Sequence, residues 1–170
     1  SLRSAVLAAN QSGPGPHTIS VPAALGTYVL SQTNPTNAAT FSTNGGIDLV
    51  VGSNRSAITI QGTGGKAIIQ RGTGGGLGDV ITTGLKADGF TPAIVNLTLD
   101  SLDITGGTFT AVFTGADDGL GNVSRTTITN STLRSNTNSD ASFGQGGAVH
   151  VARPGAAAAG AGQRRFPRSG

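Results

Sequence analysis

Residues 93–107 read Ala-Ile-Val-Asn-Leu-Thr-Leu-Asp-Ser-Leu-Asp-Ile-Thr-Gly-Gly. From Val95 the apolar side chains fall at every second position, at Leu97 and Leu99, and after a shift of one residue the alternation resumes at Leu102 and Ile104. Alternation of this kind predicts two short strands that each bury one face. The closing pair of glycines predicts a turn, so this stretch indicates β structure with frequent changes of direction.

The composition extends this expectation to the whole chain. Of the 170 residues, 28 are glycine and 11% are charged, which is less than half the usual charged share. The acidic residues are all Asp, and helix formers other than Ala are scarce. Few charges combined with ordinary hydrophobicity argue against an intrinsically disordered chain. We therefore expect one domain built from many short strands.

The charge and residue types argue against several classes of partner. The net charge is +3, and part of it lies in the arginines of residues 164–168. The rest of the chain has no clustered basic face, and one Tyr with no Trp gives little for bases to stack on, so we expect no nucleic-acid partner. Disulfides and thiolate metal sites are excluded because there is no Cys. We expect no transmembrane helix, since no apolar run reaches about 18 residues.

Residues 1–10 form the one predicted helix. Leu2, Val6 and Ala9 share one helical face, and Ser1 can cap the first turn. A helix of this length is unstable alone in water. We expect it to cover an apolar end of the β structure, where unpaired strand edges need protection.

Similar local patterns recur at steps of about 22–24 residues, as in a repeat architecture. The comparable positions are Ile60, Thr82, Ile104, Ile128 and Val151. Stacked coils of parallel strands, each burying inward aliphatic side chains against the coils above and below, fit this step. A β-sandwich is the alternative, but its hairpins would not keep such a register. We predict an all-β solenoid of about 22–24 residues per coil over residues 1–151, followed by a low-complexity, disordered tail at 152–170.

The N-terminal residues resemble a known family signature. Residues 1–22 contain Ser-Leu-Arg-Ser-Ala-Val, Ala-Ala-Asn, Pro-Gly, His-Thr-Ile and a closing Pro, and residues 26–28 add Gly-Thr-Tyr. This set is similar to the start of the bacterial CSLREA-domain proteins, and residues 57–62 and 99–107 resemble the coils of that family. Ser4 stands where the family has Glu, and the family's Cys would precede Ser1.

The resemblance implies a right-handed parallel β-helix. It also implies a structural or adhesive segment of an exported bacterial surface or extracellular protein, without catalytic activity. We expect a cell-surface or matrix polysaccharide as its partner. The alternative is a carbohydrate-binding or polysaccharide-cleaving β-helix of the lyase or hydrolase type. The oligomeric state stays open.

Asp117, Asp118 and Asn122 form the candidate metal site. Two carboxylates and an amide among glycines are oxygen ligands of the kind that Ca²⁺ takes. A solvated turn is the plainer interpretation, because the spacing of an EF-hand is missing. We expect no other cofactor.

Asp100 and Asp103 are the candidate carbohydrate contacts. Glycoside hydrolysis needs paired carboxylates, and the phase shift after Leu99 can place both side chains outside. No catalytic motif of polysaccharide-cleaving β-helices accompanies them, so solvated turn carboxylates are the plainer interpretation and we do not expect an enzyme. His17 and His150 stand alone in the sequence and are expected to be structural.

Overall fold

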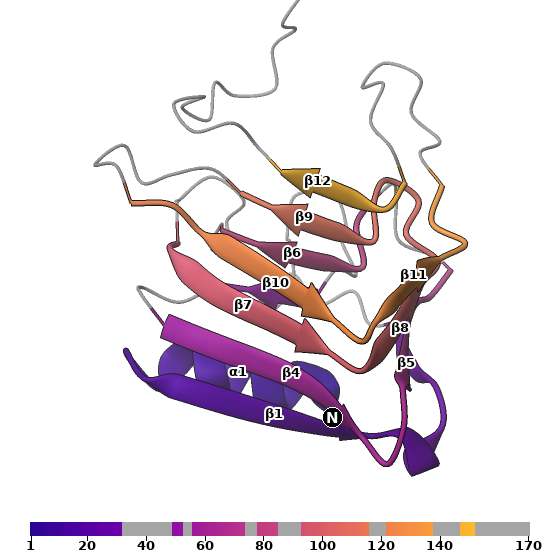
Figure 1. Ribbon diagram of the computed structural model, residues 1–170, viewed down its shortest axis with the longest axis horizontal. Coiled ribbons are helices and arrows are strands. Elements are labelled where there is room, and N and C mark those ends of the chain that lie inside the picture. Colours follow the sequence, from indigo (N-terminus) through magenta and orange to yellow (C-terminus); the bar gives the residue numbers. More distant parts are fainter. Residues whose placement is uncertain are drawn as a thin grey trace, which may run out of the picture.

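The computed structural model describes residues 1–31, 49–52, 56–73, 78–84, 93–115, 122–137 and 147–151, so the predicted tail at 152–170 lies outside the described residues. These ranges contain one α-helix, one 3-10 helix and twelve strands (Figure 1). In chain order the elements are α1 (Leu2–Gln11), β1 (Pro16–Pro22), η1 (Ala23–Leu25), β2 (Tyr28–Leu30), β3 (Leu49–Val51), β4 (Ser56–Thr63), β5 (Ala67–Arg71), β6 (Ile81–Thr83), β7 (Val95–Asp100), β8 (Leu102–Thr105), β9 (Val112–Thr114), β10 (Arg125–Thr129), β11 (Thr132–Arg134) and β12 (Val149–Val151). The predicted all-β character with one short N-terminal helix is confirmed.

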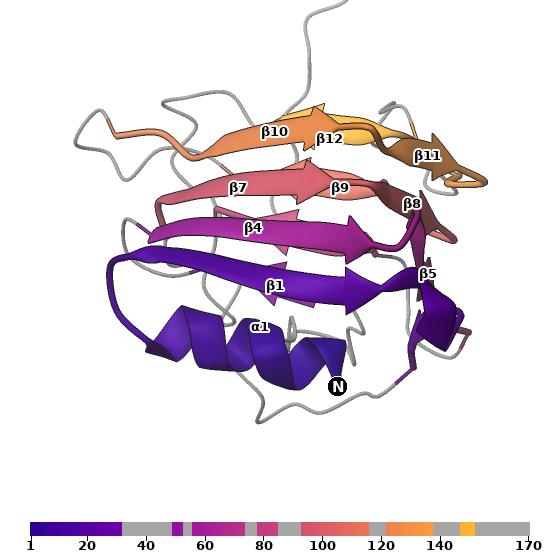
Figure 2. The same ribbon diagram turned by 60° about the horizontal axis from the view of Figure 1, so that its bottom comes forward.

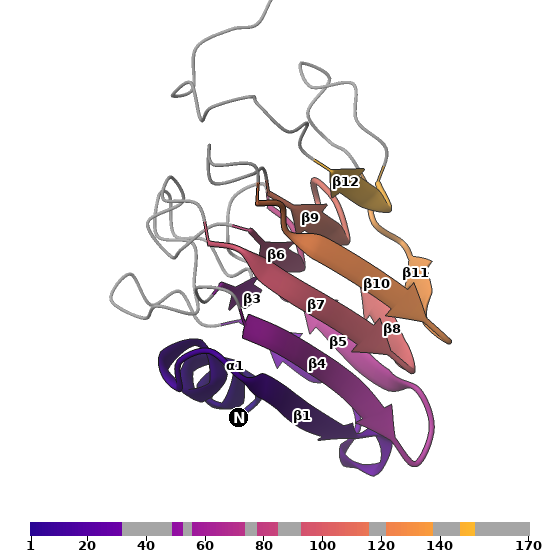
Figure 3. The same cartoon turned by 60° about the vertical axis from the view of Figure 1, so that its left-hand side comes forward.

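The strands form three four-stranded sheets, and every pairing between them is parallel. Sheet A has the order β1-β4-β7-β10, sheet B β2-β5-β8-β11 and sheet C β3-β6-β9-β12. The chain therefore visits the three sheets in turn, and each strand pairs with the strand three places further on (Figure 3). We call three successive strands, one from each sheet, a coil, so that β1–β3 form coil 1 and β10–β12 form coil 4.

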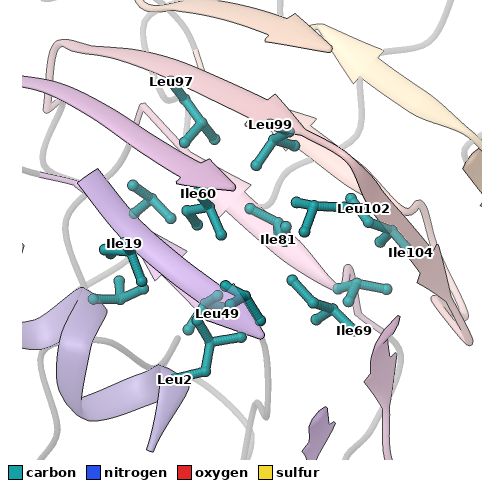
Figure 4. Close-up of a cluster of buried hydrophobic side chains, with 14 of the residues drawn as sticks. Leu2, Ile19, Leu49, Ile60, Ile69, Ile81, Leu97, Leu99, Leu102 and Ile104 are labelled. Atoms are coloured by element: carbon teal, nitrogen blue, oxygen red, sulfur yellow. The ribbon is translucent and has the colours of Figure 1, made fainter. Parts of the chain in front are cut away.

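The inner faces of the three sheets share one apolar interior (Figure 4). Sheet A contributes Ile60 and Leu99, sheet B contributes Ile69 and Ile104, and sheet C contributes Ile81, all of them fully buried. Each fully buried side chain of this size stabilises the fold by roughly 1.5–3 kcal/mol. Because each strand turns an inner side chain toward this interior, no single strand could fold without its neighbours.

The predicted step of about 22–24 residues per coil is wrong, because residues that lie over one another are further apart in the sequence. In sheet A, Gln61 pairs with Asp100, 39 residues further on. Asp100 in turn pairs with Thr129, 29 residues further on. The step between partners varies from sheet to sheet, and in all three it exceeds the predicted one. Ile104, which the prediction aligned with Ile60 and Ile128, lies in sheet B beside Ile69.

This error has a structural cause. Each predicted step passes two strands, whereas a coil has three: the step from Ile60 leads to Thr82 in sheet C, and the next leads to Ile104 in sheet B. Strands of all three sheets end in polar or glycine turns of similar composition. The sequence therefore shows the spacing of the turns but not which strand lies over which.

The one-residue shift of the apolar pattern in residues 93–107 marks the corner where the chain passes from sheet A to sheet B. Ser101 alone separates β7 from β8, and its φ of 55° is left-handed, as is the φ of 50° at Asn130 in the coil above. The Ser101 N–H donates to the Thr129 carbonyl at 3.1 Å, and the Ser101 carbonyl accepts from the Ala67 N–H at 3.1 Å. In the coil below, a Cβ at Gly62 would collide with the Ser101 carbonyl oxygen. The predicted pair of strands is confirmed, and its corner needs a residue without a side chain beneath it.

Helix α1 covers the coil 1 end of the stack, as predicted (Figure 2). It packs on β1 and β3 and buries Leu2, Val6 and Ala9. Ser1 caps it by accepting from the Ser4 N–H at 3.2 Å. Its last turn is tied to β3 by Asn10, which donates to the Val50 carbonyl at 3.0 Å and accepts from the Gly52 N–H at 3.1 Å. Within the described ranges, no helix combines the length and apolarity that crossing a membrane requires.

Replacing Ile104 with Asp should unfold the protein. The side chain is fully buried, and an unpaired carboxylate there costs several kcal/mol, a large part of a total stability of about 5–15 kcal/mol. Circular dichroism during a thermal melt measures the loss. Asn96→Asp, at an exposed position of β7, is the matched control and should melt close to the wild type. An unchanged melting temperature for Ile104→Asp would contradict the shared interior.

Candidate functional site

Four threonines lie in register along the outer face of sheet A. They are Thr18 of β1, Thr59 of β4, Thr98 of β7 and Thr127 of β10. Each precedes an inward Ile or Leu, so the alternation of the strand turns every one of them outward. None of their hydroxyl groups hydrogen-bonds another group within the described part of the chain. This threonine row presents hydroxyl and methyl groups at intervals of about 4.8 Å, the spacing of paired strands.

A second outer row of sheet A is centred on Asp100, with Ser20, Gln61 and Thr129 in register. Oδ1 of Asp100 accepts from Asn130 Nδ2 and from Thr129 Oγ1, both at 2.9 Å, and Oδ2 accepts from Gln61 Nε2 at 3.0 Å. These hydrogen bonds, with Asn130 first, lower the pKa of Asp100 below its usual 3.8. Asp100 is therefore a fixed anion that links coils 2, 3 and 4.

Asp103 lies across the corner from Asp100, on the outer face of sheet B. Both its oxygens accept from Arg134 Nε at 2.9 Å, and Oδ2 also lies 2.8 Å from Arg134 Nη2. The carboxylate raises the pKa of Arg134 through its hydrogen bonds and its charge. Both predicted aspartates thus face outward, but they lie on different sheets and bind different partners.

Sequence reasoning missed a buried polar cluster between sheets B and C. Asp79, with 8% of its surface exposed, accepts from the Thr110 N–H at 3.1 Å and from Thr110 Oγ1 at 2.7 Å through Oδ1. Its Oδ2 accepts from Thr82 Oγ1 at 3.3 Å, and its backbone carbonyl accepts from Arg71 Nε at 3.2 Å. Burial raises the pKa of Asp79, against the opposing hydrogen bonds of the two threonines and the charge of Arg71. The only signal was an Asp at the end of a glycine-rich stretch.

Three polar side chains of coil 4 bond to backbone groups at the three corners of coil 3. Ser124 accepts from the Val95 N–H at 3.2 Å, Ser131 from the Leu102 N–H at 3.0 Å and Asn136 from the Gly107 N–H at 2.8 Å. Each also donates to a carbonyl of coil 3: Ala93, Leu99 and Ile104 respectively. Asn136 also donates to the Arg134 carbonyl at 2.9 Å. These groups are therefore structural.

The candidate Ca²⁺ site lies mostly outside the described residues. Asp117 and Asp118 fall between the described ranges, and only Asn122 lies within them. Among the described residues no three His, Cys, Asp or Glu side chains gather in a way that could hold a metal ion. The Ca²⁺ site stays a prediction.

The two histidines lie at opposite ends of the stack. The ring of His17 in β1 has Nε2 3.1 Å from the Gly13 carbonyl oxygen. His150 in β12 packs edge-on against Phe113, with ring centroids 5.0 Å apart, and burial lowers its pKa. They belong to different sheets, so they do not form a common site.

No family model matches the chain, and comparison with curated proteins and with solved structures gives no match either.

Asp100 should stabilise the fold in a way that is lost in acid. Because its pKa is lower in the folded state, its contribution is complete above pH 3.8 and disappears as the pH falls through the lowered value. Urea denaturation between pH 7 and pH 2 measures the free energy of unfolding. As the pH falls, this free energy should decrease less for Asp100→Asn than for the wild type. Asn130→Ala keeps the carboxylate but removes its main donor, so its acid-induced loss of unfolding free energy should be smaller than that of the wild type and should be complete at a higher pH. If the free energy of unfolding fell in the same way with pH in all three proteins, this role of Asp100 would be contradicted.

Asp79 should depend on pH in the opposite way to Asp100 and should contribute most to the stability of the fold at low pH. Its pKa is higher in the folded state, so its contribution is complete below pH 3.8 and declines as the pH rises through the raised value. Asp79→Asn keeps an acceptor for Thr110 but cannot ionise, so its unfolding free energy should not decline over that window. The same urea titrations measure the difference between the two curves, and parallel curves above pH 3.8 would contradict a raised pKa of Asp79 in the folded protein.

Proposed function

We propose that the chain is a segment of a right-handed parallel β-helix from an exported bacterial surface or extracellular protein, with a structural and adhesive role. Two observations support this proposal. The chain visits three parallel sheets in turn around one interior, and a helix covers the first coil. The N-terminal sequence also resembles that of the CSLREA-domain proteins, for which export and a β-helix are the expectation.

The threonine row is the observation that carries the adhesive role. It runs across all four strands of sheet A, is uncharged along its length, and leaves four hydroxyl groups without a partner in the described part of the chain. A repeating row of hydroxyl and methyl groups suits a ligand that is itself neutral, repetitive and rich in hydroxyl groups. We therefore infer that sheet A binds a neutral polysaccharide along this row.

The site chemistry favours binding over cleavage. An acid that protonates a glycosidic oxygen needs a raised pKa, whereas hydrogen bonds lower the pKa of Asp100. Asp103 is held in an ion pair with Arg134. Each carboxylate therefore binds its own partners on its own sheet. The two do not face each other across a site where they could flank one glycosidic bond, as the two carboxylates of a glycosidase do.

The double variant Thr59→Val, Thr98→Val tests this proposal, because Val keeps the shape and strand preference of Thr but removes the hydroxyl. Retention of the purified protein on insoluble neutral polysaccharides, such as cellulose and chitin, measures binding. At about 0.5–1.5 kcal/mol per lost hydrogen bond, the double variant should bind roughly tenfold more weakly or worse.

Thr137→Val, at an exposed position away from sheet A, is the matched control and should bind as the wild type does. Equal retention of the double variant and the wild type would contradict the role of the threonine row. So would a wild-type protein that binds none of the neutral polysaccharides.

A further inference from the structure

Two side-chain amides flank Asp100 on the outer face of sheet A. Gln61 in β4 donates from Nε2 to Asp100 Oδ2 at 3.0 Å, and Asn130, directly after β10, donates from Nδ2 to Asp100 Oδ1 at 2.9 Å. They come from coils 2 and 4, on the two sides of β7 (Figure 2). Gln61 is half-buried and Asn130 is exposed, so a ligand can reach both. We call Gln61 and Asn130 the amide pair.

Asp100 determines which atoms of the amide pair stay open to a ligand. An ionised carboxylate only accepts hydrogen bonds, so each amide must turn its NH2 group toward it. Each amide then keeps its carbonyl oxygen and its second N–H hydrogen. Neither of these groups has another partner in the described part of the chain. The pair therefore presents two acceptors and two donors that the bonds to Asp100 hold in place.

The amide pair adjoins the threonine row. Asp100 follows Thr98 by two residues on the same face of β7, a distance of about 6.6 Å along the strand. Gln61 has the same offset from Thr59 in β4. A sugar that lies on the threonine row can therefore turn one of its substituents toward the amide pair.

We propose that this site selects polysaccharides whose sugars carry acetamido groups, a class that includes chitin and the glycan strands of peptidoglycan. This inference rests on the proposed binding along the threonine row and adds the substituent that is recognised. The N–H and the carbonyl of an acetamido group point in opposite directions, as in a trans peptide. It therefore fits between a group that accepts and a group that donates, and the amide pair offers both on the two sides of Asp100.

Other substituents fit this place less well. A sugar hydroxyl has a single oxygen and reaches only one amide of the pair. A carboxylate would lie beside the charge of Asp100 and be repelled. An ammonium group would be attracted by that charge, but Thr129, Gln61 and Asn130 already donate to the two oxygens of Asp100.

Isothermal titration calorimetry with three β-1,4-linked tetramers tests the proposal: those of N-acetylglucosamine, glucosamine and glucose. The wild type should bind the N-acetylglucosamine tetramer roughly tenfold more tightly than the glucose tetramer, the effect of about two added hydrogen bonds. Equal affinity for these two would overturn the inference and leave the proposed function in place. Tighter binding of the glucosamine tetramer than of the acetylated one would also overturn it, because the charge of Asp100 would then decide the preference.

The double variant Gln61→Met, Asn130→Gly removes both amides. Met keeps the length of the Gln side chain, and Gly tolerates the left-handed backbone at Asn130, where φ is 50°. This variant should bind the N-acetylglucosamine tetramer roughly tenfold more weakly and the glucose tetramer as the wild type does. The unchanged glucose affinity shows that the fold is intact. An equal loss for both tetramers, or a preference that survives, would refute the role of the amide pair.

Two further variants separate this inference from the proposed function. Gln70→Met changes an exposed glutamine of β5 on sheet B, and this matched control should keep the preference. Thr59→Val, Thr98→Val should weaken the binding of both tetramers by the same factor, since the threonine row contacts either sugar. Loss of the preference in Gln70→Met would contradict the assignment to the amide pair.

Retention on insoluble polymers identifies the source of the ligand. The wild type should be retained more strongly on chitin, on purified peptidoglycan or on both than on cellulose. Retention on cellulose alone would contradict the selection of acetamido groups. A protein that binds none of the three polymers would contradict the proposed function as well.

Discussion

Parallel backbone pairing between each strand and the strand three places further on governs every other feature of this protein. In such a ladder each residue lies beside one partner in the coil below and one in the coil above. Because side chains alternate between the two faces of a strand, residues that are in register lie side by side on the same face. The column Ile19, Ile60, Leu99 and Ile128 forms the interior because its members are in register. The neighbouring threonines form an outer row for the same reason, so core and surface follow from one constraint.

Local alternation was enough to predict strands, but not their partners. The break at Ser101 separates β7 from β8 in the sequence as it does in the structure, because a one-residue corner must shift the phase of the buried face. The partner of a strand is set by contacts that are distant in the sequence, and the steps between partners differ from one pair of coils to the next. Segments of unequal length separate the strands of different sheets, so no fixed period survives in the sequence. What remains visible is the shorter spacing between similar turns, which spans two strands instead of three.

The same limit applies to the candidate site. The outward position of Asp100 and Asp103 could be predicted from the phase shift alone. Their partners could not, since Gln61 comes from coil 2 and Asn130 and Arg134 come from coil 4. The threonine row has a faint local signal, a Thr followed by Ile or Leu. That signal becomes meaningful only when the register brings the four copies together.

The corners carry more of the stability than the strands' lengths suggest. Strands of sheet C have three residues each, so the backbone ladder there is short and stops at every corner. At those points Ser124, Ser131 and Asn136 supply the acceptors and donors that the interrupted ladder lacks. At about 0.5–1.5 kcal/mol for each hydrogen bond, the six hydrogen bonds at the three corners together match the burial of about two or three aliphatic side chains. Coil 4 can therefore hold its place on coil 3 even though its own inner side chains are half open to water, because its attachment depends on polar contacts below it as much as on apolar contacts inside.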